Sequence, residues 1–120
     1  MQSILHQIAA HRLGPILILV LAAFLEAAGD SYFQSGLYRT SGAVRVLSFA
    51  GGAAMLVLYG LLVNLPRWEF GRLLGVYVVL VFLMAQFLAK VRFHQSPTPP
   101  ILVGGSLIVI GGLVITFWKG

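Results

Sequence analysis

Long uncharged segments separated by short polar ones form the main pattern of this 120-residue chain. A helix that crosses the hydrocarbon of a bilayer needs about 20 mostly apolar residues. We predict four such helices, over residues 13–38, 46–66, 73–89 and 100–118. Strands of a membrane β-barrel would alternate polar and apolar positions over about ten residues, and these segments do not alternate. The pattern therefore predicts an all-α membrane protein whose residues 1–120 form a single domain of four transmembrane helices.

The composition supports this interpretation. Hydrophobic residues make up 59% of the chain and charged residues only 9%, whereas soluble domains carry roughly a quarter charged residues. The connections are too short to hold another domain, and short connections make consecutive helices run antiparallel. The first segment alternatively fits the pattern of a secretory signal peptide, but Glu26 falls where the apolar part of such a peptide would continue.

The basic residues are divided equally between the two sides of the predicted membrane. The side that holds the N-terminus carries four of them: Arg12, Arg67, Arg72 and Lys119. The other side also carries four: Arg39, Arg45, Lys90 and Arg92. Because an excess of Lys and Arg normally marks the cytoplasmic side, this equality gives no preferred orientation. Either another feature fixes the topology, or the chain inserts in both orientations and the two orientations pair as an antiparallel homodimer.

Glu26 and Asp30 are the only acidic residues within a predicted span, and Glu26 lies near the midpoint of its segment. Their spacing places both carboxyls on one helix face, about 6 Å apart along the axis. An ionisable group at that depth costs about 2.5–3.5 kcal/mol on insertion scales and marks a functional site by default. The alternative is that the pair has a structural role and joins helices by hydrogen bonds, with Gln86, Tyr59 or Tyr77 as the partner.

A carboxyl in this position suggests exchange chemistry. Desolvation disfavours its charged form, so the group can hold a proton or release it in favour of a cationic ligand. Tyr59 and Tyr77 are polar aromatic residues within spans and are suited to stacking on a lipophilic cation. Asp30 is either a second titrating group, a residue wetted near one rim of the cavity, or the partner of a basic side chain at a helix end.

Glycine pairs recur after seven residues in the last span, and such stripes let helix backbones approach closely in membranes. We expect the stripe to pack the dimer through Gly104, Gly105, Gly111 and Gly112. The histidines are too scattered for a metal site, the chain contains no cysteine, and no nucleotide-binding or nucleophile motif occurs. We therefore expect no enzymatic activity, no cofactor, no metal ion and no nucleic-acid partner.

Several short segments of the chain match a known family pattern. They are Leu25-Glu26-Ala27-Ala28-Gly29 followed by Tyr32, Leu58-Tyr59-Gly60, Phe70-Gly71-Arg72 and Gly75-Val76-Tyr77. Together with four short spans, an acid midway along the first and glycines in the fourth, they resemble the small multidrug resistance superfamily. Within this superfamily the chain is most similar to the YnfA family of small inner-membrane proteins.

The resemblance implies an antiparallel homodimer in the bacterial inner membrane that exports hydrophobic or guanidinium-like cations against protons. Glu26 would be the shared proton and substrate site, with Tyr59 and Tyr77 in its wall. Asp30 and the connection over residues 90–100 depart from the family pattern. The resemblance therefore supports the fold more strongly than the identity of the substrate. The alternative is a non-transporting membrane subunit or half of a heterodimeric lipid-carrier flippase, because related four-span proteins include such subunits.

Overall fold

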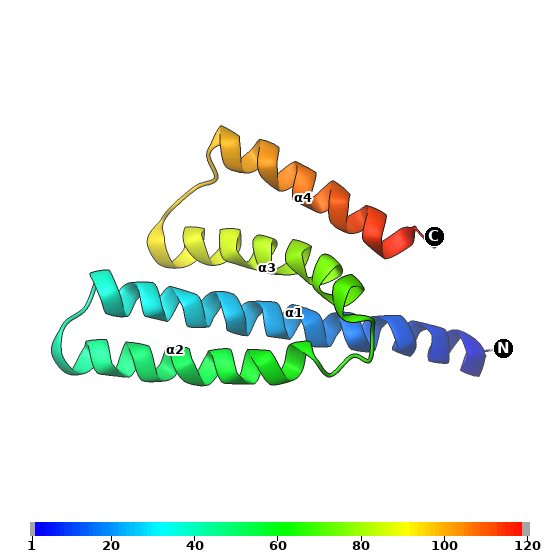
Figure 1. Cartoon of the computed structure of the whole chain (residues 1–120), viewed down its shortest axis with the longest axis horizontal. Coiled ribbons are helices and arrows are strands. Elements are labelled where there is room, and N and C mark those ends of the chain that lie inside the picture. The colour runs from blue at the N-terminus through cyan, green and yellow to red at the C-terminus, as the bar shows by residue number, and fades with distance from the viewer. Residues whose placement is uncertain (1, 119–120) are drawn as a thin grey trace.

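The structure is a computed structural model that describes the backbone of residues 2–118 and the side chains of residues 14–118. It consists of four helices (Figure 1): α1 Gln2–Tyr38, α2 Gly42–Val63, α3 Phe70–Phe93 and α4 Pro99–Phe117. All of α2, α3 and α4, and the part of α1 from Gly14 to Tyr38, are long and apolar enough to cross a membrane. The prediction of an all-α protein with four candidate membrane spans is confirmed.

The helix ends differ from the predicted spans in both directions. α1 begins at Gln2 rather than at residue 13, and α3 includes Arg72 and Arg92, which the sequence analysis assigned to connections. Long basic side chains can lie along an apolar surface while their charged ends reach polar groups, so a charge does not end a helix. α2 ends at Val63, earlier than predicted, because Pro66 disfavours helical conformation at the residue before it.

The four helices form an open layer and not a closed bundle. α1 packs between α2 and α3, and α4 packs on α3 alone (Figure 1). In the part of the chain that the structure describes, no other two helices bring their backbones together. Figure 1 shows α4 diverging from α3 toward the connection between them. A single chain therefore leaves α2 and α4 as the two edges of the layer.

Glycines set the close approach of α1 and α2, which share the most extensive helix contact in the chain. A Cβ atom added to Gly29 would lie 3.0 Å from the Gly52 carbonyl oxygen, and one added to Gly52 would lie 2.9 Å from the Gly29 carbonyl oxygen. Gly36, seven residues after Gly29, lies against the ring of Phe49 in the same way. Small residues at this spacing give α1 a smooth face along which α2 lies.

The four glycines of α4 face in two directions. A Cβ atom on Gly105 would lie 2.5 Å from the ring of Phe82 in α3, and one on Gly112 would overlap Val79 of the same helix. At Gly104 and Gly111, no described atom lies within 4 Å of an added Cβ. One row of glycines thus packs α4 on α3 within the chain, and the other row is open. A role in dimer packing remains a prediction.

Candidate functional site

Glu26 lies at the middle of the spanning part of α1. This part runs from Gly14 to Tyr38 and has 25 residues, which leaves 12 on either side of Glu26. At 1.5 Å per residue, the carboxyl-bearing residue is therefore about 18 Å along the helix from each end of the span. The side chain is half-buried, on the side of α1 that faces α3.

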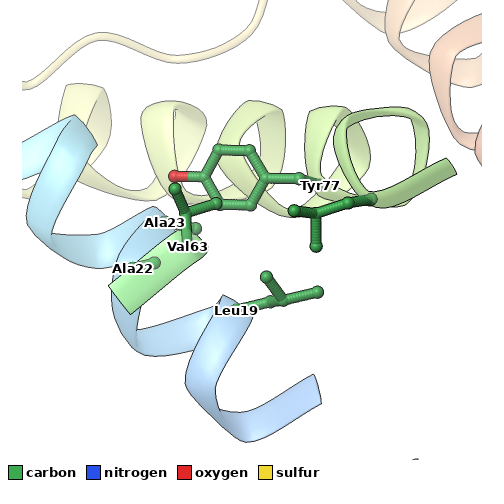
Figure 2. Packing of buried hydrophobic residues seen from close by; sticks show 6 residues of the cluster. Leu19, Ala22, Ala23, Val63 and Tyr77 are labelled. Carbon is green, nitrogen blue, oxygen red and sulfur yellow. The ribbon is translucent and has the colours of Figure 1, made fainter. Parts of the chain in front are cut away.

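Tyr77 of α3 holds the Glu26 carboxyl. Its hydroxyl donates a hydrogen bond to Glu26 Oε1 over 3.1 Å. The tyrosine is only 3% exposed, since the small side chains of α1 leave room for its ring. Figure 2 shows this packing, in which the buried cluster consists of Leu19, Ala22, Ala23, Val63, Leu73 and Tyr77. Burial fixes the ring, so the direction of its hydroxyl toward Glu26 is fixed as well.

Tyr59 completes the site from α2. Its ring stacks on that of Tyr77, with 5.7 Å between the ring centroids and an angle of 25° between the planes. Three helices therefore contribute one residue each: a carboxyl from α1 and two phenol rings from α2 and α3. The ring of Tyr59 is only partly buried, and a ring face near a carboxylate is suited to hold an organic cation, which gains about 0.5–2 kcal/mol from a well-placed ring.

Of the three hydrogen-bonding partners suggested for Glu26, the structure brings two to the site and excludes one. Tyr77 bonds to it directly, and Tyr59 lies against Tyr77. Gln86 lines a groove between α3 and α4, on another side of α3. The prediction of hydrogen bonding between helices is therefore confirmed for Tyr77 and wrong for Gln86.

Asp30 is exposed and does not join the Glu26 cluster. It lines a separate cavity of about 220 Å³ between α1 and α3, together with Ala27, Ser31, Gln34, Val81, Ala85, Leu88, Ala89, Phe93 and Gln95. Asp30 lies one helical turn from Glu26 toward the end of α1. Of the roles considered for it, a wetted position near one rim of the cavity agrees with its exposure, and the other roles stay predictions.

A basic side chain at a helix end was one suggested partner for Asp30, but Arg92, at the end of α3, makes other contacts. Its guanidinium donates hydrogen bonds to the hydroxyls of Ser31 and Ser35 and stacks over the Tyr32 ring, 4.1 Å from the ring centroid. These contacts join the ends of α1 and α3. These contacts were not predicted, because Arg92 lies outside the predicted span, although two serines four residues apart within a span were a signal.

Comparison with known proteins identifies a relative but no solved structure. No protein-family model matches the chain, and no solved structure matches it. A protein of Herpetosiphon aurantiacus described as "UPF0060 membrane protein" is 31% identical to it over 106 residues, which cover 86% of this chain and 93% of that protein. The similarity thus extends over most of both chains. With its four candidate membrane spans, the chain belongs to the YnfA-like UPF0060 family of small four-helix membrane proteins.

Proposed function

We propose that this protein is a proton-coupled transporter, related to the small multidrug resistance superfamily, that exports small lipophilic or guanidinium-like cations. One observation carries the proposal: a carboxyl at the middle of a membrane span, hydrogen-bonded by Tyr77 and flanked by the stacked ring of Tyr59. Ionisable residues inside a membrane mark proton and substrate pathways by default. The bacterial inner membrane is the proposed location.

Competition at Glu26 supplies the coupling. The ionised carboxyl attracts a cation, and the partly exposed ring of Tyr59, backed by that of Tyr77, adds attraction for its apolar or planar parts. Protonation removes the charge that holds the cation. Because the two occupants exclude one another, a proton entering from one side drives release of the cation, and a departing proton allows the next cation to bind.

The open layer favours a second copy of the chain. Four helices in this arrangement do not surround Glu26, since α2 and α4 lie at the edges. The equal division of basic residues supports pairing in opposite orientations, which would give the dimer the inverted symmetry common in transporters. The open glycine row at Gly104 and Gly111 is the contact that we propose for α4 of the two copies.

Transport by reconstituted protein tests the proposal. Proteoliposomes with an imposed proton gradient are supplied with guanidinium or tetraphenylphosphonium, and electrogenic currents are recorded. Glu26→Gln should abolish the coupled current. Glu69→Gln is the matched control, because Glu69 is exposed before α3 and its side chain caps no backbone group. Coupled transport that persists in Glu26→Gln would refute the proposal.

The exposed edges of α2 and α4 equally suit a second function, that of a membrane subunit paired with a different chain or half of a heterodimeric lipid-carrier flippase. A reporter fused to the C-terminus separates the two functions. Signals from both sides of the membrane support the inverted homodimer. A signal from one side alone supports a fixed topology and a different partner.

A further inference from the structure

We propose that the cavity at Asp30 is a water-filled path through which protons reach Glu26, with the Asp30 carboxyl as the relay group. This inference rests on the proposed role of Glu26 as a proton site. It adds the route, which leads from the membrane surface where α1 and α3 end. It also gives a function to Asp30, which the Glu26 cluster does not use.

The positions of the polar residues on α1 trace this route. Glu26, Asp30 and Gln34 follow one another at intervals of four residues, each step covering about 6 Å along the helix. Asp30 and Gln34 line the cavity, and so does Ala27, the residue after Glu26. Gln95 lines it at the other end, beyond the last residue of α3. The cavity therefore extends from Ala27, the neighbour of Glu26 in the sequence, to Gln95 in the connection between α3 and α4.

The opposite wall continues from Tyr77 along α3. Val81, Ala85 and Ala89 follow Tyr77 at the same four-residue interval, and all three line the cavity. The cavity thus begins within one helical turn of the Tyr77–Glu26 hydrogen bond on both helices. The alanines in this wall lack the bulk to close it.

The size and lining of the cavity suit water. A volume of about 220 Å³ has room for several waters. Purely apolar cavities remain dry, and water needs polar partners. Asp30, Ser31, Gln34 and Gln95 provide hydrogen-bonding groups along its length. Water molecules can therefore form a chain from the connection at Gln95 to Asp30, which lies one helical turn from Glu26.

Asp30 is the one ionisable side chain among the described residues that line this cavity. Nearby, Arg92 is engaged with Ser31 and Ser35, and the Arg39 guanidinium lies over the ring of Phe93. In the relay, a hydronium ion that enters along the cavity gives its proton to the Asp30 carboxylate and is left as water. Asp30 then passes a proton through water to the Glu26 carboxylate. Asp30 ends as a carboxylate and Glu26 as a carboxylic acid, so the proton is conserved.

Cysteine labelling tests the water path without measuring transport. The chain contains no cysteine, so single-cysteine variants have no background reaction. In Ala85→Cys the thiol enters the cavity, where water allows the reactive thiolate to form. Phe87→Cys is the control, because Phe87 is exposed on α3 and lies outside the cavity. In proteoliposomes, a charged methanethiosulfonate should label residue 85 at least tenfold faster than residue 87. Equal rates would overturn the proposal and indicate a dry or lipid-filled cavity.

Transport kinetics test the relay itself. Asp30→Asn should slow the proton-driven current at least tenfold and leave the affinity for the cation unchanged. The affinity is measured by the fluorescence of Trp68, which packs beside the core. Asp30→Glu should restore the rate. If Glu26→Gln is inactive but Asp30→Asn transports at the wild-type rate, the relay is wrong and the proposed function stands. If Glu26→Gln keeps coupled transport, the proposed function fails and the relay fails with it.

Discussion

A methyl group added at Gly52 tests how closely α1 and α2 approach. The added Cβ would lie 2.9 Å from the carbonyl oxygen of Gly29 and 3.0 Å from the ring of Phe33. The oxygen belongs to the backbone of a helix, so it cannot turn aside as the end of a flexible side chain would. Gly51, one residue earlier, has no described atom within 4 Å of an added Cβ. Gly51→Ala is therefore a matched control on the same helix.

The expected magnitude follows from two opposing effects. Alanine stabilises a helix by about 0.8–1.0 kcal/mol relative to glycine, and both variants gain this. Overpacking at a tight contact costs about 1–3 kcal/mol, and only Gly52→Ala incurs this cost. The free energies of unfolding of the two variants should therefore differ by about 1–3 kcal/mol, with Gly52→Ala the less stable.

Unfolding in detergent micelles measures this difference. The purified variants are titrated with sodium dodecyl sulfate, and loss of structure is followed by circular dichroism and by tryptophan fluorescence. Gly51→Ala should unfold at or above the midpoint of the unmodified chain, and Gly52→Ala below it. If Gly52→Ala is as stable as Gly51→Ala, the two helices do not touch at this glycine and the described packing is wrong.

Four further substitutions test other contacts. Arg72→Gln removes a guanidinium that donates to carbonyl oxygens at the end of α4, so amide hydrogen exchange in the last turn of α4 should accelerate while exchange in α2 does not change. Tyr77→Phe removes the hydrogen bond to Glu26. The free energy of unfolding in micelles should fall by about 1 kcal/mol, and transport should slow without being abolished. Gly112→Ala should loosen α4 from α3, seen as weaker disulfide trapping between paired cysteines on these helices. Gly111→Ala should leave that trapping intact and reduce cross-linking between copies, and the reverse pattern would contradict the two-row assignment.

The helices were predictable because their signal is local. Hydrocarbon thickness requires about 20 apolar residues, and the chain shows four such segments directly. The position of Glu26 midway along the first span follows from counting residues. The exact helix ends were less predictable, because basic residues such as Arg72 and Arg92 continue a helix while their charged ends reach polar groups.

The partners of each helix face depend on tertiary packing, which the spacing alone does not determine. The repeat of glycines in α4 predicts two smooth rows, yet nothing in it distinguishes the row containing Gly105 from the row containing Gly104. Only the rings and methyl groups of α3 make that distinction. In the same way, Tyr77 and Gln86 were equal candidates as partners of Glu26, and the side of α3 on which each lies decided between them.

The arrangement of contacts also separates the site from assembly. Glu26, Tyr59 and Tyr77 join α1, α2 and α3 through one hydrogen bond and one ring stack, so a change in the occupant of Glu26 acts on all three helices. α4 contributes none of these residues and packs on α3 alone. A helix that contacts one neighbour and keeps an open glycine row is suited to hold a second copy while the site changes its occupant. We therefore expect substitutions in the open row of α4 to change dimer stability before they change the affinity for the cation.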